Sequence, residues 1–146
     1  MVVRDMSDVE EARTLFREYA SSLPFALDFQ GFDQELADLP APYTPPRAAL
    51  LLARGVGCVG LRPFDATTCE LKRLYVRPAA RGAGLGRRLV EAIVTEARRL
   101  GYAHMRLDTV PGMDAAQSLY EQVGFRETAP YRPNPIPGAR FLELEL

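Results

Sequence analysis

The sequence predicts an α+β fold, a mixed sheet flanked by about four helices, and two observations lead to it. Short segments rich in strand formers alternate with amphipathic segments of helical periodicity. Strands joined by short turns precede residue 77, and a glycine-rich loop with a long helix separates them from the next strand. Short turns pair strands antiparallel, whereas a helical crossover pairs them in parallel, so the central sheet should be mixed and mostly antiparallel.

The length of 146 residues allows a substantial hydrophobic core, and we expect a single domain over residues 1–146. The composition, 47% hydrophobic and 25% charged, is typical of a globular protein. No apolar run approaches the roughly 18 residues that cross a bilayer, and the first residues lack the apolar region of a signal peptide. These features predict a cytoplasmic protein that does not enter a membrane.

Two cysteines, Cys58 and Cys69, are too few for a disulfide framework. Together with His104 they show no metal-ligand spacing, so we expect no metal site. Both fall in predicted strands, where we expect them to be reduced and half-buried.

The net charge of −1 argues against nucleic-acid binding through bulk electrostatics. Basic residues are nevertheless concentrated between positions 70 and 99, where eight stand against three acidic residues, a net of +5. A local positive field on a mildly acidic protein suits a small polyanion better than a duplex.

The first third of the chain is mostly helical in this interpretation. Residues 2–5 predict a short strand, Ser7 and Glu10 mark a capping box, and residues 33–39 predict a short helix that Pro40 ends. The first helix should bury Val9, Ala12, Phe16, Tyr19 and Ala20. The prolines that follow the second helix predict an extended connection rather than a domain linker, because neither side is large enough alone.

The middle of the chain predicts an antiparallel meander of strands at 48–54, 58–64 and 69–77, joined by tight turns. Pro78 ends the third strand because proline cannot donate to a ladder. After the glycine loop a long amphipathic helix runs to Leu100, with Gly101 as its C′ residue.

The last third predicts a strand at 103–108, a turn at Pro111 and Gly112, and a helix with Asp114 as its N-cap. That helix should bury Ala116, Leu119, Tyr120 and Val123, and should end at Gly124. Closing strands follow at 126–131 and 141–146, and the three prolines within 132–138 exclude a regular strand between them.

The strand, loop and helix at residues 69–90 form the most informative stretch. Gly82, Gly84 and Gly86 open the helix, whose first N–H groups have no intrahelical partner and attract anions. A dinucleotide fingerprint would need a glycine where Arg87 stands, and the lysine of a Walker loop is absent. Taken alone, this glycine pattern favours an ordinary turn before an amphipathic helix.

Two further motifs resemble the GNAT superfamily of N-acetyltransferases. Residues 81–86, Arg-Gly-Ala-Gly-Leu-Gly, match its R/Q-x-x-G-x-G/A signature and follow Leu-Tyr-Val-Arg-Pro, which is similar to its strand 4. Residues 116–125, Ala-Gln-Ser-Leu-Tyr-Glu-Gln-Val-Gly-Phe, resemble its A-x-x-L-Y-x-x-x-G-F segment. The resemblance is strong from about residue 50 to residue 126, and the order and spacing of the motifs make it specific.

The resemblance implies an acetyl-CoA-dependent N-acetyltransferase, with acetyl-CoA as co-substrate. In this family a bulge splays strand 4 from strand 5, so that backbone groups of strand 4 pair with the pantetheine arm. The implied cofactor-binding residues are Leu74, Tyr75, Val76, Arg81, Gly82, Ala83, Gly84, Leu85, Gly86 and Arg87.

Two side chains are candidates for proton transfer. Glu70 lies where many members of the family have a glutamate that serves as general base, and its alternative is a solvated carboxylate paired with Lys72 or Arg73. Tyr120 holds the family's tyrosine position and is the candidate acid for the departing thiolate, with helix packing as the alternative. Met113 replaces an asparagine that contacts pantetheine in many members, so Asp108, Thr109 or backbone should take over that contact.

Three functions compete on these observations. An N-acetyltransferase that moves an acetyl group to an amine by direct attack on the thioester comes first. A non-catalytic acyl-CoA-binding or sensing module on the same fold is the alternative, and a binder of another phosphate ligand is the third.

The sequence does not identify the acceptor, a small-molecule or peptide amine. Asp28, Asp33 and Glu35 suit a cationic acceptor, although surface charges of a helix explain them more simply. As further partners we expect no nucleic acid and no membrane, and we allow for a second copy of the chain in a homodimer.

Overall fold

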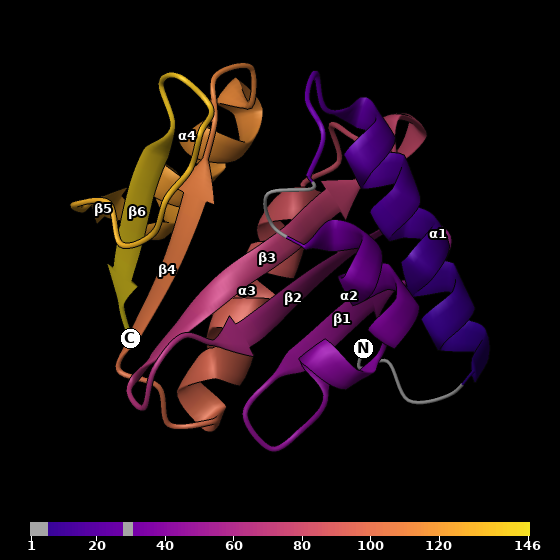
Figure 1. Cartoon of the computed structure of the whole chain (residues 1–146), viewed down its shortest axis with the longest axis horizontal. Coiled ribbons are helices and arrows are strands. Elements are labelled where there is room, and N and C mark those ends of the chain that lie inside the picture. Colours follow the sequence, from indigo (N-terminus) through magenta and orange to yellow (C-terminus); the bar gives the residue numbers. More distant parts are fainter. Residues whose placement is uncertain (1–5, 28–30) are drawn as a thin grey trace.

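The structure, a computed structural model, describes residues 6–27 and 31–146, which form a six-stranded sheet with four α-helices (Figure 1). The helices are α1 (Met6–Ser22), α2 (Phe32–Asp38), α3 (Leu85–Arg99) and α4 (Asp114–Val123). The strands are β1 (Ala49–Ala53), β2 (Gly57–Pro63), β3 (Thr68–Val76), β4 (His104–Thr109), β5 (Arg126–Glu127) and β6 (Arg140–Glu145).

The sheet has the strand order β1-β2-β3-β4-β6-β5. Only β3 and β4 run parallel, and α3 makes the crossover between them, whereas every other neighbouring pair is antiparallel. This arrangement confirms the predicted mixed, mostly antiparallel α+β fold.

Two hydrophobic clusters cover the two faces of the sheet. Helices α3 and α4 pack on one face, where Val90, Ile93, Met105 and Leu142 are fully buried. Helices α1 and α2 cover the β1–β3 part of the opposite face, where Phe16 is fully buried. Figure 1 shows α3 behind the sheet, with α2 in front of it.

A bulge interrupts β3 at Arg73 and Leu74. Cys58 of β2 pairs with Tyr75, but Gly60, two residues on, pairs with Lys72, so β3 carries one extra residue there. Because of this extra residue, both Lys72 and Arg73 lie on the α1 and α2 side of the sheet, while Leu74 packs with the α3 cluster.

Strands β3 and β4 separate beyond their first three residue pairs. Their parallel pairing covers residues 68–70 and 104–106 only, and Figure 1 shows the two strands diverging from that end. The bulge and the splay expected from the family resemblance are therefore both present. Their consequence is an opening in the middle of the sheet.

Several predicted boundaries differ from the structure. The strand expected at 2–5 lies outside the described residues, and α1 already begins at Met6, so Ser7 lies inside the helix. Capping patterns locate a helix end only to within one or two residues. Asp114 is likewise in the first turn of α4 rather than at the N-cap, which is Met113. A carboxylate still favours that first turn through the helix dipole.

Two segments were wrongly predicted as extended. The proline-rich connection contains a 3-10 turn at Ala41–Tyr43. The closing strand expected at 126–131 shrinks to Arg126–Glu127, because the chain leaves the sheet after Thr128 donates to the Phe141 carbonyl at 2.8 Å. Pro130 cannot donate to a ladder, and the next residue, Tyr131, bonds to Glu70 instead.

Both cysteines are free thiols and fully rather than half-buried, and burial raises the pKa of each to about 12. Along residues 6–27 and 31–146, no helix combines the length and the apolar character that a membrane span requires.

Candidate active site

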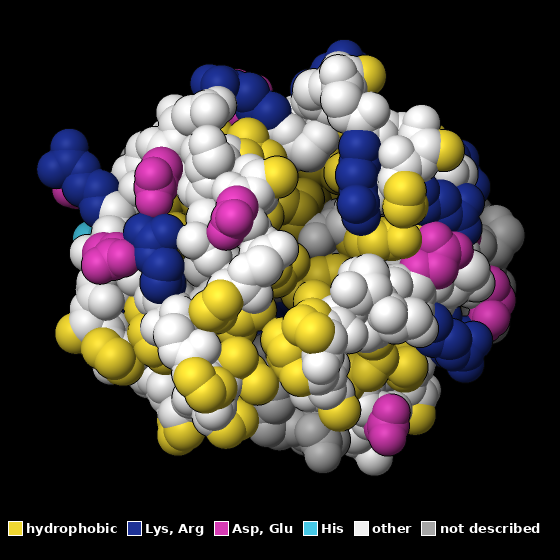
Figure 2. Space-filling view, turned by 90° about the horizontal axis from the view of Figure 1, so that it is seen from above, with side chains coloured by type: hydrophobic (Ala, Val, Ile, Leu, Met, Phe, Trp, Pro, Cys, Tyr) yellow, Lys and Arg dark blue, Asp and Glu magenta, His cyan; other side chains and the backbone are white. Residues whose placement is uncertain are grey.

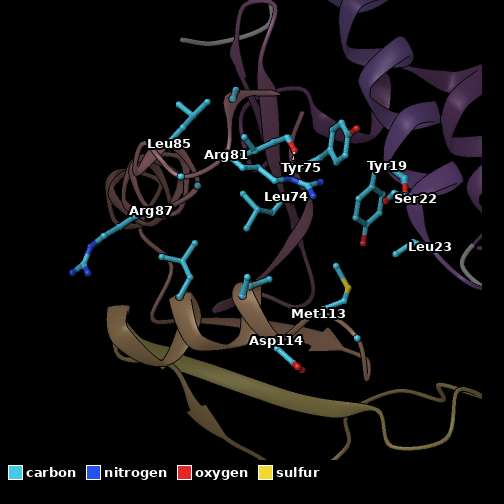
Figure 3. Close-up of a pocket in the computed structure, with 18 of the residues that line it drawn as sticks. Tyr19, Ser22, Leu23, Leu74, Tyr75, Arg81, Leu85, Arg87, Met113 and Asp114 are labelled. Atoms are coloured by element: carbon cyan, nitrogen blue, oxygen red, sulfur yellow. Dashed lines mark hydrogen bonds between the residues drawn. The ribbon is translucent and has the colours of Figure 1, made fainter. Parts of the chain in front are cut away.

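The main cavity, of about 580 Å³, lies where β3, the glycine loop, α4 and the end of α1 meet. Figure 2 shows it as a hollow with hydrophobic side chains around it. In Figure 3, Tyr19 of α1 stands across the cavity from Leu74, and Met113 and Asp114 come from the start of α4. Nine of the ten predicted cofactor-binding residues line this cavity, and Ala83 does not.

The glycine loop leads into the positive end of α3. Gly84 is the N-cap of α3 with a φ of 79°, and Gly82 has a φ of 88°. A Cβ on either residue would meet no atom within 4 Å, so the backbone conformation, not packing, is what favours glycine. No side chain caps this helix at Gly84, and its first residues, 85–87, line the cavity, so its first N–H groups are available there as an anion site.

Arginines flank the loop in different ways. Arg81 extends into the cavity, where its Nε donates to the Val76 carbonyl at 2.9 Å (Figure 3). Arg87 points away from the cavity and lies 3.4 Å from Glu91. Arg81 is therefore the cation placed to meet an anion in the cavity.

A second, smaller cavity of about 40 Å³ occupies the opening between β3 and β4. It shares Tyr19, Leu74 and Met113 with the main cavity, so the two adjoin. Its remaining lining comes from both faces of the sheet: Leu71, Lys72, Arg73, Leu107, Asp108, Thr109 and Tyr120. The opening in the sheet therefore connects the main cavity with side chains that can exchange protons, those of Lys72, Asp108 and Tyr120.

Tyr120 lies against this smaller cavity. Its ring packs edge-on against Phe125, with ring centroids 5.6 Å apart. Burial raises the pKa of its hydroxyl, which therefore stays protonated at neutral pH. Both the acid and the packing interpretations of Tyr120 are consistent with this position.

Glu70 is buried and lines neither cavity. It accepts hydrogen bonds of 2.8 Å from the Tyr131 hydroxyl and from Arg132, and the Lys72 ammonium lies 3.9 Å away. The alternative of a solvated carboxylate is therefore wrong, although the pairing with Lys72 that it named is present, and Arg73 bonds to Glu35 instead. To act as a base, Glu70 would have to receive a proton while it is bonded to Tyr131 and Arg132.

Sequence reasoning assigned no catalytic role to Lys72 or Asp108, which the structure brings to the smaller cavity. Burial lowers the pKa of Lys72 to about 8, although the nearby Glu70 carboxylate works in the opposite direction. Asp108 accepts a 3.0 Å hydrogen bond from Asn134. Alternation along the strands places both side chains on one face, but only the splay shows that this face borders a cavity.

The acidic residues proposed for a cationic acceptor do not act as a group. Glu35 is buried and bonded to Arg73, so it is not the surface charge that the sequence suggested. Burial opposes ionisation, but hydrogen bonds and charge from Arg73 keep the pKa of Glu35 below its ordinary value. Asp33 is exposed on α2, and Asp28 lies outside the described residues.

Met113 lines both cavities, whereas Asp108 and Thr109 line only the smaller one. A thioether thus stands where the family asparagine is expected, and among residues 6–27 and 31–146 the main cavity has no carboxylate in its lining except that of Asp114. In the described part of the chain, no three or more His, Cys, Asp and Glu side chains cluster as metal ligands.

Comparisons of the sequence with known proteins point to one family. The model of the acetyltransferase (GNAT) family matches residues 10–125. An uncharacterised N-acetyltransferase of Schizosaccharomyces pombe is 41% identical over 145 residues, which cover 95% of this chain and 89% of that protein.

Two solved structures share the fold. An acetyltransferase from Streptococcus agalactiae superposes with a TM-score of 0.79 at 19% identity, over 100% of this chain and 96% of that one. An acetyltransferase from Salmonella typhimurium, solved with acetyl-CoA, superposes with a TM-score of 0.73 at 22% identity, over 98% of this chain and 91% of that one.

Proposed function

The chain belongs to the acetyltransferase (GNAT) family, and from this premise we propose that it moves the acetyl group of acetyl-CoA to an amine by direct attack on the thioester. The observation that carries the proposal is the junction of the two cavities. The main cavity runs from the anion-binding end of α3 along Leu74–Val76 of β3, and the smaller one opens at the end where a thioester would lie.

The long, mostly apolar main cavity suits the parts of CoA in order. The pyrophosphate meets the first N–H groups of α3 and the guanidinium of Arg81. The pantetheine arm runs beside the end of β3, where no strand of the described chain pairs on the β4 side. Its thioester then reaches the opening between β3 and β4, beside Tyr120.

In the reaction, the amine nitrogen forms a bond to the acetyl carbon and the carbon–sulfur bond breaks. An alkylamine has a pKa of about 10.4, so it must first lose a proton, and Glu70 receives this proton through water. Tyr120, which burial keeps protonated, donates to the sulfur as negative charge develops there. The ammonium nitrogen loses two protons as it becomes an amide. One passes through water to Glu70 and on to solvent, and the other replaces the proton that Tyr120 gives to the sulfur, so the products are the amide, the CoA thiol and one released proton.

The first experiment screens a panel of amines with acetyl-CoA and detects free CoA thiol. Release that depends on a particular amine, with the acetylated product identified by mass, supports the transferase. CoA binding without thiol release for every amine class supports the non-catalytic binding module instead. Tighter binding of ADP than of CoA would support the third function, a different phosphate ligand.

The cofactor site is tested with Gly84→Val, matched by Gly101→Val as control. Both glycines have φ near +80° and open space around them, so both variants carry the strain of a left-handed L residue, about 1–2 kcal/mol or more. Only Gly84 lines the main cavity. We expect calorimetric titration to show at least roughly tenfold weaker CoA binding for Gly84→Val, about 1.4 kcal/mol, and near wild-type binding for Gly101→Val. Equal CoA affinities of the two variants would show that CoA does not bind at the glycine loop.

A further inference from the structure

Among the residues that the structure describes, Arg73 alone has a positive φ without being glycine. Its φ of 61° falls in the left-handed region, which is unfavourable for a long side chain. The position is the bulge of β3, where glycine would adopt the same backbone without strain. An arginine at this site needs compensation from its surroundings.

The compensation comes from α2. Arg73 donates from Nε and Nη2 to the two carboxylate oxygens of Glu35, at 2.9 and 3.0 Å, in a bidentate pair. The two side chains are 2% and 3% exposed, so water screens the pair little. The guanidinium also lies over the ring of Phe32, 5.1 Å from its centroid, and the thiol of Cys58 donates to the Arg73 carbonyl at 3.4 Å.

Glu35 is itself held in place. It accepts the Tyr43 hydroxyl at 2.9 Å and Arg62 at 3.0 Å. Tyr43 lies directly on the strand beside the bulge, because a Cβ on Gly60 would come within 2.6 Å of its ring. The carboxylate is thus a rigid anchor, and the bulge is fastened to it.

We propose that the Glu35–Arg73 pair is a positioning device for acetyl-CoA, because it fixes the bulge that turns the following residues of β3 toward the main cavity. Leu74, Tyr75 and Val76, the three residues after the bulge, all line that cavity. Neither Arg73 nor Glu35 lines the main cavity, although Arg73 borders the smaller one, so the pair acts on the main cavity through the backbone that it holds. This inference rests on the proposed cofactor site.

The test variant is Arg73→Gly, which relieves the backbone strain and leaves Glu35 bonded to Arg62 and Tyr43. Without the side chain, a residue of the binding strand must be ordered each time CoA binds. We expect CoA affinity, measured by calorimetry well below the melting temperature, to fall about tenfold. The KM for acetyl-CoA should rise by the same factor.

The matched control is Arg62→Met, which removes the other guanidinium from the same carboxylate. The Arg62 side chain is 37% exposed, and Arg62 pairs with Glu70 in regular register, away from the bulge. The CoA affinity of Arg62→Met should therefore stay within about twofold of wild type. A merely structural role of the network predicts equal losses of affinity in the two variants, or none in either, and each of these results overturns the proposal.

Should Arg73→Gly fail to fold, Arg73→Lys serves in its place, because it keeps the charge and loses the bidentate geometry. About threefold weaker CoA binding by this variant supports the device, and wild-type affinity overturns it. Gly84→Val separates this result from the proposed site. If that variant loses CoA while the Arg73 variants bind normally, the cofactor site stands and only the positioning role is lost.

Discussion

The two faces of the sheet differ in what they bury. On the α3 and α4 face the buried cluster consists of apolar side chains with Tyr102 and Tyr120. On the opposite face, burial includes the charged side chains of Glu35, Glu70, Lys72 and Arg73. Burying a charge costs free energy that an apolar core does not incur. The difference teaches that the α3 and α4 face stabilises the fold by apolar packing, while the opposite face adds buried charges to its own apolar cluster and gives up some stability to hold a geometry.

The opening between β3 and β4 breaks this division at one point. There Tyr120, which packs with the apolar cluster, shares a cavity with Lys72 and Asp108 of the charged face. A residue of the stabilising face thus reaches the proposed reaction. Substitutions in the α3 and α4 cluster and substitutions of the buried charges opposite should therefore separate stability from activity, except at this opening.

Tyr120→Phe should give the largest effect. It removes one hydroxyl and leaves the ring against Phe125, so the free energy of unfolding should change by no more than about 1–2 kcal/mol. Acetyl transfer to the best amine should fall by about 10²–10⁴, the usual contribution of an acid catalyst. Melting temperature and turnover are measured on the same protein. Turnover within about threefold of wild type would make Tyr120 a packing residue.

Glu70→Gln should lower kcat by about 10² at neutral pH, at the lower end of general-base effects because water relays the proton. The loss should shrink toward pH 10, as the amine deprotonates unaided. Tyr131→Phe is the matched variant, because it removes one of the hydrogen bonds to Glu70 and keeps the carboxylate. A loss of kcat that is the same at every pH, and that Tyr131→Phe reproduces, would show that Glu70 positions Tyr131 and Arg132 and is not the general base.

Ile93→Ala tests the stabilising face. Ile93 is a fully buried residue of α3 and does not line either cavity. Urea denaturation should show a loss of about 2–5 kcal/mol, the cost of a large-to-small change in a core. CoA affinity should remain within about twofold at temperatures where the variant is folded. A selective loss of CoA binding would mean that the two faces are not independent.

Lys72→Met should give the smallest effect, and it depends on pH. Burial lowers the folded-state pKa of Lys72 to about 8 from an ordinary 10.5. Below pH 8 the folded protein therefore holds a buried ammonium at full cost, and the cost is relieved as the pH rises from 8 toward 10.5. The stability of the wild type relative to Lys72→Met should increase over that interval, as followed by urea denaturation. A difference that does not vary with pH would mean that Lys72 titrates normally.

Periodicity and turn residues predicted the order of the helices and strands in the described chain. Helix α3 and strand β4 each bury one well-marked face, and β1–β3 are runs of strand formers between turns that are buried on both faces. Periodicity and turn residues failed where side chains far apart in sequence decide the local structure. The segment after Glu127 leaves the sheet because Tyr131 and Arg132 bond to Glu70, about 60 residues away. No local pattern contains that information.

The candidate site divides in the same way. The glycine loop and Tyr120 were identified from short motifs, because their chemistry depends on neighbours along the chain. Arg73 and Glu35 were not, since an arginine within a strand and a glutamate on a short helix are ordinary in isolation. The two residues are 38 positions apart, so their pairing at the bulge is seen only in the three-dimensional structure.

The short pairing of β3 with β4 joins the two halves of the sheet at one end of these strands and leaves them apart at the other. In the described chain, three ladder pairs at 68–70 and 104–106, with the N–H groups of Ala103 and His104 donating to the Thr67 carbonyl beside them, join its two halves through the backbone. Amide protons of β3 that face the open part should exchange with solvent faster than those bonded to β2. A pantetheine arm in the opening would act as the missing strand. Bound CoA should therefore slow amide exchange in both β3 and β4 beside the opening. The two halves of the sheet should then unfold together on heating.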